Sequence, residues 1–233
     1  MKQIIICLFA LISFASCRYT TGSGNIITDK RNVGNFNGIS VGGAFEVEVK
    51  IGPATELTIE ADDNIMKYIE TKVSGGILKI RTEDLHNYSD VHMKIYITTP
   101  GLTSIRTSAS AEVKVLDMLT GKDRLSFHAS SSGDIDADID VPEVETDASS
   151  GGSINLRGKT KNYHAQASSG ASIRTYDLLS ENTKVQVSSG ASAKVHASIS
   201  LDARASSGGT ISYHGAANVT KSESSGGNIS KKD

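Results

Sequence analysis

Small residues recur in the second half of the chain at a regular spacing. The stretches "DASSGGSIN", "QASSGASIR" and "RASSGGTIS" share one tripeptide, whose second residue is a serine. It occurs six times, at intervals of 19, 19, 20, 18 and 18 residues: Ser131, Ser150, Ser169, Ser189, Ser207 and Ser225. Apolar and polar residues alternate on both sides, as around Val185, Val187, Ala191 and Ala193. Because residues two apart share one face of a strand, this alternation predicts strands with one buried face.

The period and the alternation together predict an all-β solenoid, a single-stranded parallel β-helix with one coil of 18–20 residues per repeat. The alternation keeps its phase through the tripeptide, so we expect the second serine to point inward. We interpret the six serines as a structural corner, narrow enough to admit only Ser, Gly or Ala. The glycine that follows each of the last five serines is suited to a positive φ. A flexible Gly/Ser linker is the alternative, but it predicts neither a period nor a shared phase.

The first half shows a looser pattern, which predicts irregular N-terminal β coils over residues 25–105 ahead of the regular repeat at 106–233. Residues 25–233 are expected to form one continuous domain. An aspartate cap candidate followed by Ile65, Met66 and Ile69 predicts a short helix near 63–72. "VHMKIYITTPGLTSI" predicts two strands with a turn at Pro100 and Gly101. These coils should close one end of the stack, where strand edges would otherwise be exposed.

The N-terminus indicates export. Residues 1–16 resemble a lipoprotein signal peptide, with one lysine, an apolar run from Ile4 to Ile12 and "FAS" before Cys17. The apolar run is too short to span a membrane. We therefore predict lipid attachment at Cys17, a flexible tether over 17–24, and an outer-membrane lipoprotein that faces the periplasm or the outside. A secretory signal with an incidental cysteine is the alternative. Cys7 leaves with the signal, so the mature body has no other thiol. A formal net charge of −2 argues against nucleic-acid binding.

The chain resembles a known family, the auto-transporter adhesin head GIN domain family of Bacteroidetes lipoproteins. The stretches that carry the resemblance begin with "GNFNGISVGGAFEVEVKIGPATELTIEADDNIMKYIETKVSGGILKI" and continue with "KIYITTPGLTSI" and the Ser-Ser-Gly repeats. The resemblance covers about residues 25–230 and implies a right-handed β-helical body on an exported protein. It implies no catalytic residues.

One outward strand carries candidate chemistry. Asp134, Asp136, Asp138 and Asp140 alternate along "GDIDADIDV" and share one face, as a Ca²⁺ site or an acid/base pair would require. The repeat register offers another interpretation, in which Asp136 stacks between Lys114 and Asn155, and Asp138 stacks on Arg157. The same register puts His196 beside His214, so that their rings stack, but no third metal ligand is evident.

These observations favour a non-enzymatic, adhesin-like binding or structural module at the cell envelope, with no cofactor and no catalytic residue. Its expected partners are the membrane, through Cys17, and a glycan or surface protein. The alternative is a carbohydrate-active β-helix enzyme, lyase- or hydrolase-like, that uses the face from Asp134 to Asp140. Lys231 and Lys232 end the last coil and should blunt its edge, which favours a monomer.

Overall fold

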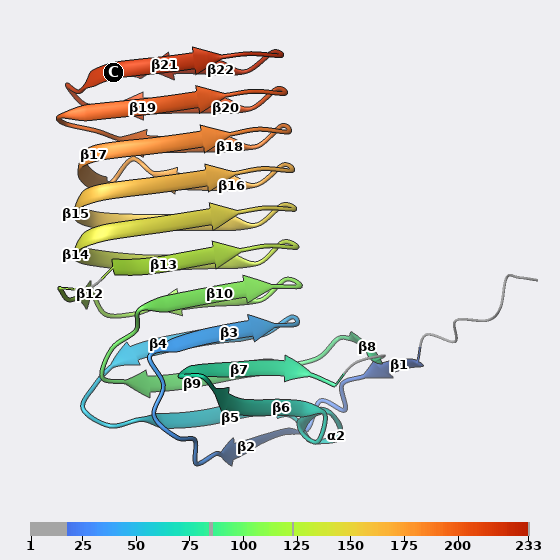
Figure 1. Cartoon of the computed structure of the whole chain (residues 1–233). Helices are drawn as coiled ribbons and strands as arrows, with labels where there is room; N and C mark the ends of the chain where they lie inside the picture. Colours follow the sequence, from blue (N-terminus) through green and yellow to red (C-terminus); the bar gives the residue numbers. More distant parts are fainter. Residues whose placement is uncertain (1–17, 84–85, 123, 233) are drawn as a thin grey trace, which may run out of the picture.

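The computed structural model describes residues 18–83, 86–122 and 124–232, and these form a parallel β-solenoid of about seven turns with an irregular N-terminal region. The predicted all-β coil architecture is therefore confirmed, and Figure 1 shows the coils stacked one above another along a single axis. Residues 1–17, which include the predicted signal peptide and the predicted lipid-attachment residue Cys17, lie outside the described residues. Within the described ranges, no helix has the length and apolar character needed to cross a membrane.

Each regular coil contributes one strand that leads into the serine corner and one that leaves it. We call the sheets that these strands build the entry sheet and the exit sheet. The entry sheet comprises β10 (Ser104–Ser108), β13 (Arg124–Ala129), the second parts of β14 (Asp134–Ala148) and β15 (Ser153–Ala167), β17 (Leu178–Val187), β19 (Ser200–Ala205) and β21 (Asn218–Glu223). The exit sheet comprises β11 (Glu112–Val115), β12 (Leu119–Thr120), the first parts of β14 and β15, β16 (Ser172–Thr175), β18 (Ser192–His196), β20 (Thr210–His214) and β22 (Asn228–Lys231).

The core consists of columns of apolar side chains that repeat from coil to coil. One column on the exit sheet keeps the predicted register through every regular coil: Ile135, Ile154, Ile173, Ala193, Ile211 and Ile229, all buried. The alternation seen in the sequence therefore marks the buried face correctly on both sides of the corner. Tyr163 adds a polar contact inside this core, because its hydroxyl lies 3.0 Å from the Thr146 hydroxyl.

The serine corner is a two-residue turn, and its serines point the other way from the prediction. Ser150 and Gly151 have φ of 49° and 75°, and the Gly152 N–H donates to the Ser149 carbonyl at 2.8 Å. Two successive residues with positive φ and this hydrogen bond define a type I′ turn. Two left-handed residues break the strand alternation, so the second serine is exposed at all six corners. The small residue two positions later, such as Gly152, takes the inward position instead.

A seventh corner of the same geometry precedes the six that contain serine at this position. Ala109 and Ser110 have φ of 51° and 65°, and the Ser110 N–H donates to the Ser131 carbonyl of the next coil at 3.1 Å. An equivalent bond joins later corners, for example from the Gly151 N–H to the Ser169 carbonyl at 3.1 Å. This corner is not recognisable from the repeated tripeptide, because "SAS" stands at residues 108–110 in place of Ser-Ser-Gly.

The N-terminal end of the stack is closed by antiparallel strands, as a solenoid cap requires. β3 (Gly38–Gly42) and β4 (Glu46–Ile51) pair in parallel with β10 and β11 and so continue the coils downward. β5 (Glu56–Asp62) pairs antiparallel with both β2 (Ile26–Lys30) and β9 (Met93–Thr99). β6 (Ile69–Ser74) and β7 (Ile77–Thr82) form an antiparallel hairpin. The strand, turn and strand predicted around Pro100 are present as β9 and β10.

The predicted helix is shorter than expected. α2 covers only Asp63–Met66, and Ile69 belongs to β6. Asp62 precedes the helix but makes no side-chain capping bond. Its buried carboxylate instead accepts hydrogen bonds from the backbone N–H groups of Gly24 and His92, each at 2.7 Å. Burial of Ile65, Met66 and Ile69 explains the helix-like pattern, which a helical turn followed by a strand also satisfies.

Candidate functional site

The four aspartates in the first part of β14, Asp134, Asp136, Asp138 and Asp140, lie on the outer face of the exit sheet, and three of them have cationic partners. Arg157 donates to both oxygens of Asp136, at 2.7 and 3.1 Å, and to Asp138 at 2.7 Å. Lys159 lies 3.1 Å from Asp140. The repeat register predicted the pair of Asp138 and Arg157 and the position of Asp136 between Lys114 and Asn155, and the structure has both. The contacts of Arg157 with Asp136 and of Lys159 with Asp140 were not predicted. The Arg157 hydrogen bonds hold the pKa of Asp136 below its ordinary value, against the opposing effect of burial.

This arrangement does not suit a metal cage or an acid/base pair. Successive outward residues of one strand are about 7 Å apart, so their carboxylates do not converge on one cation. Among the described residues, no cluster of three or more His, Cys, Asp or Glu side chains is placed to hold a metal ion. A general acid needs a carboxyl whose pKa is raised, whereas that of Asp136 is lowered. Sheet pairing therefore accounts for Asp136, Asp138 and Asp140, whereas the Asp134 side chain makes no ion pair with any described residue.

The two histidines of the exit sheet do not stack on each other. His196 and His214 are register partners in adjacent coils, but the His214 ring stacks on Tyr176, with centroids 4.0 Å apart and planes 10° apart. The Nζ of Lys194 lies 5.9 Å from the Tyr176 ring centroid. The expected pair of rings is thus replaced by a tyrosine–histidine pair that spans two coils.

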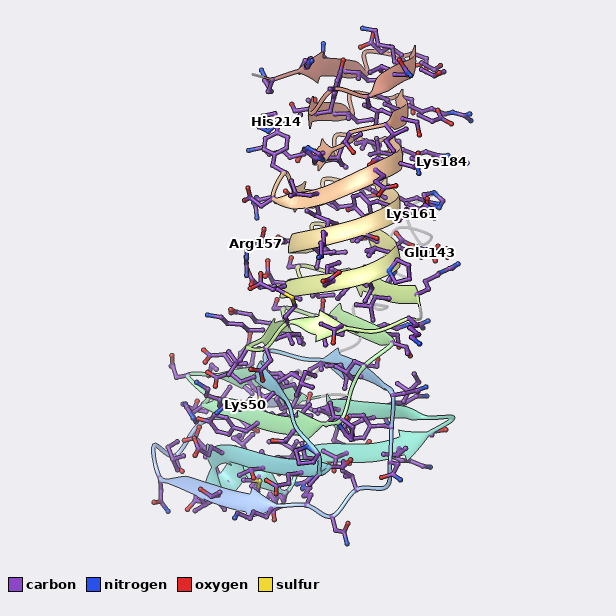
Figure 2. The ribbon with its side chains drawn as sticks, turned by 90° about the vertical axis from the view of Figure 1, so that its left-hand side faces the viewer. Lys50, Glu143, Arg157, Lys161, Lys184 and His214 are labelled. Atoms are coloured by element: carbon purple, nitrogen blue, oxygen red, sulfur yellow. The ribbon has the colours of Figure 1, made fainter. Side chains whose placement is uncertain are left out.

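The outer face of the entry sheet is hollowed. We call it the entry face; Figure 2 shows Glu143 and Lys184 pointing outward on this side of the stack, opposite Arg157 and His214. Two adjoining hollows of about 450 and 480 Å³ lie along it. Their polar lining comprises Asp147, Gln166, Gln186, Arg204 and Ser222 in one, and Glu143, Asn162, His164, Asn182, Lys184, Ser200, Asp202, Asn218 and Thr220 in the other.

Polar columns run along the entry face because each outward position recurs in every coil. In one column the Asn182 amide donates to Asn162 at 3.2 Å, and the Ser200 hydroxyl donates to Asn182 at 2.8 Å. In the next columns, Lys184 and Gln186 make no side-chain hydrogen bond or ion pair with any part of the chain that the structure describes. Their donors and acceptors are therefore available to a ligand, at positions about 7 Å apart along one strand of one coil.

Sequence reasoning passed over the entry face because it searched for clustered charge. The usable signal was a different one, namely a polar residue at the outward position seven residues before each corner serine. Asn162, Asn182, Ser200 and Asn218 occupy this position in successive coils. Amides and hydroxyls in such columns offer hydrogen bonds in both directions without a concentrated charge.

Comparisons with known proteins agree with this architecture. Residues 35–217 match the family described as "putative auto-transporter adhesin, head GIN domain". A "putative adhesin" from Bacteroides fragilis is 22% identical, with 91% of this chain and 100% of that chain covered and a TM-score of 0.83. A "putative lipid binding protein" from Parabacteroides distasonis is 20% identical, with 93% and 100% covered and a TM-score of 0.75. At these identities the likeness shows a shared fold. No curated protein matches the chain.

Proposed function

The chain belongs to the auto-transporter adhesin head GIN domain family, and on that premise we propose that it is an exported, non-enzymatic binding module that recognises glycan through its entry face. The observation that carries the proposal is the pair of adjoining hollows on this face, which amide, hydroxyl and charged side chains line together with apolar ones. Sugar hydroxyls both donate and accept hydrogen bonds, as do the amides of Asn182 and Gln186 that line the hollows. A face of this kind favours wet recognition by many modest contacts.

A binding role is also supported by the state of the exit-sheet carboxylates. Asp136 and Asp138 share Arg157, and Asp140 pairs with Lys159. A hydrolase or lyase on this sheet would need carboxyls that exchange a proton with the substrate, and of these four aspartates only Asp134 lacks an ion pair with the described residues. We therefore assign Asp136, Asp138 and Asp140 to holding neighbouring coils together.

We further propose that the protein is anchored by lipid at Cys17 and acts as a monomer in the cell envelope. The last coil supports the monomer, because inward positions that hold Ala203 and Ala205 in β19 hold Lys221 and Glu223 in β21. The Glu223 carboxylate accepts a hydrogen bond from the Ile229 N–H at 2.5 Å. Inward-pointing charges at an edge oppose the addition of another strand. The charges at Lys221 and Glu223 thus oppose edge-to-edge association together with those of Lys231 and Lys232.

A glycan array tests the binding face. The lipid-free body would be screened first, and the best glycan titrated against a Lys184→Ala/Gln186→Ala variant and a Lys194→Ala control from the exit sheet. Loss of two hydrogen bonds, one of them to a cation, should weaken binding at least tenfold, since about 1.4 kcal/mol corresponds to a factor of ten. The control should bind as the parent does. Unchanged affinity in the entry-face variant, or an array without any bound glycan, would overturn the proposal.

A further inference from the structure

Exposed apolar side chains gather at the start of the described chain. Eight large hydrophobic residues are exposed among the described residues, and three of them fall within ten residues of Cys17. These three are Tyr19, Ile26 and Ile27, with 71%, 44% and 39% of their surface exposed. We call the region that carries them the N-terminal apolar patch, although Ile26 and Ile27, as consecutive residues of a strand, project to opposite faces of it. Tyr19 lies on β1 (Arg18–Thr21), and the two isoleucines begin β2, the outermost strand of the N-terminal cap (Figure 1).

The segment that carries this patch is held to the body and is not the flexible tether that the sequence indicates. β1 pairs in parallel with β8 (His86–Ser89), and the Gly22 N–H donates to the Ser89 carbonyl at 3.2 Å. The acidic residues before and within α2 hold the next turn. The Asp63 carboxylate accepts from the Ser23 hydroxyl at 2.6 Å and from the Asn25 amide at 2.8 Å. These bonds lower the pKa of Asp63, so the contact persists at neutral pH.

More bonds fix the same segment from the same elements. Asp62 accepts from the Gly24 N–H at 2.7 Å, and the Asn64 amide donates to the Thr21 carbonyl at 2.8 Å. The patch therefore has a defined position on the body. Any group attached to Cys17 is separated from this fixed segment by a single peptide bond, because Arg18 is already part of β1.

The short length of chain between Cys17 and Tyr19 determines how close the patch lies to a lipid attached at Cys17. Two residues span at most about 7 Å, so Tyr19 stays within that distance of Cys17 along the chain. A bilayer is about 40–45 Å thick with a hydrocarbon core of about 30 Å, which leaves about 5–7 Å of headgroup region on each side. A diacylglycerol on Cys17 puts that residue at the headgroup level. Tyr19 is then held at the same level, where tyrosine side chains are enriched.

We propose that the N-terminal apolar patch docks on the lipid bilayer, so that the solenoid is seated on the membrane surface and does not swing on a linker. The inference rests on the proposed lipid anchor at Cys17, which brings the patch to the bilayer. The neighbourhood fits such a surface, since Tyr68 and Tyr88 lie beside each other with centroids 6.4 Å apart and Tyr88 pairs with Thr20 of β1. The Lys67 Nζ lies 4.9 Å from the Tyr68 ring centroid, and both side chains combine an apolar body with a polar end, as suits a membrane interface.

A single-tryptophan experiment tests the docking, because the chain contains no tryptophan. The lipidated full-length Tyr19→Trp variant would be placed in phosphatidylethanolamine/phosphatidylglycerol vesicles, with or without brominated acyl chains. Tyr176→Trp, on the exit sheet of the solenoid, is the matched control. We expect the brominated lipid to quench Tyr19→Trp fluorescence about twofold or more, because an interfacial ring lies near the bromine atoms. Tyr176→Trp should keep its intensity.

Mass spectrometry of the N-terminal peptide shows whether the lipid is attached to Cys17, and so distinguishes failure of the proposed anchor from failure of the proposed docking. If the lipid is attached and Tyr19→Trp is quenched no more than Tyr176→Trp, the docking is wrong and the anchor stands. A Tyr19→Trp signal that is shielded from aqueous iodide but not quenched by brominated lipid shows that a protein covers the patch, which also overturns the docking. If no lipid is attached, the anchor and the docking both fail. Glycan binding by the lipid-free body is independent of all these outcomes.

Discussion

Two glycines of the solenoid share a positive φ but differ in what surrounds them. Gly158 lies in β15 with a φ of 109°, and a Cβ added there would lie 2.1 Å from the backbone oxygen of Ile139 in the coil below. Gly170, in the serine corner, has a φ of 72°, and an added Cβ would have no atom within 4 Å. Replacing each by alanine therefore separates backbone strain from steric overlap.

The expected costs follow from these two surroundings. An L-residue in the left-handed region costs about 1–2 kcal/mol, and this is the whole cost for Gly170→Ala. Gly158→Ala has a comparable strain and also a contact about 1.4 Å closer than the ordinary separation of about 3.5 Å. The blocking atom belongs to the hydrogen-bonded backbone, so a coil must shift, at a typical cost of about 1–3 kcal/mol. We expect Gly158→Ala to be less stable than Gly170→Ala by about 2 kcal/mol.

Urea denaturation followed by circular dichroism measures the difference, with equal m-values as the condition for comparing the two variants. Amide hydrogen exchange would locate the loss, which should centre on β14 and β15 for Gly158→Ala and on the corners around Gly170→Ala. Equal destabilisation of the two variants would refute the reasoning, because it would mean that neighbouring coils separate at no cost.

Two further predictions concern titratable groups. Burial raises the pKa of Tyr163 to about 12, whereas an unfolded tyrosine ionises near 10, so this residue should cost stability as the pH rises from about 10 to 12; Tyr163→Phe should remove that loss in urea titrations across this range. The pKa of Asp136 is lowered by Arg157, so their pairing should stabilise the fold above the ordinary aspartate pKa and be lost as the pH falls through the lower folded value. Because the pair is partly exposed, Arg157→Ala should cost about 1 kcal/mol or less at neutral pH and nothing in strong acid; an equal loss at both would contradict this assignment.

The regular coils were predictable to the level of side-chain neighbours. Lys114, Asp136 and Asn155 are neighbours in the structure because a repeat of known length, wound in parallel, puts equivalent positions side by side. Asp138 and Arg157 follow for the same reason. The length of one repeat was sufficient to predict these neighbours, because the same parallel strand pairing continues through the regular coils.

The corner and the candidate binding face were predicted less well. Alternation alone does not tell whether a chain passes a corner with one residue or with two left-handed residues, and this choice turned Ser150 outward. Strand register also does not determine the orientation of a side chain, so it did not predict that the His214 ring stacks on Tyr176 and not on His196. The hollows of the entry face depend on the depth of neighbouring side chains, which no linear pattern states.

The sequence by itself determined the coil length, the buried columns and the pairing of outward residues, because burial of every second residue is a local property that the ladder repeats. The tertiary structure alone decided the antiparallel closure of the N-terminal end and the attachment of residues 21–25 to Asp62, Asp63 and Asn64. These contacts join positions 38 to 43 residues apart without a repeat between them. Their formation depends on which surfaces remain unpaired once the coils have stacked, and that is known only when the whole chain is folded.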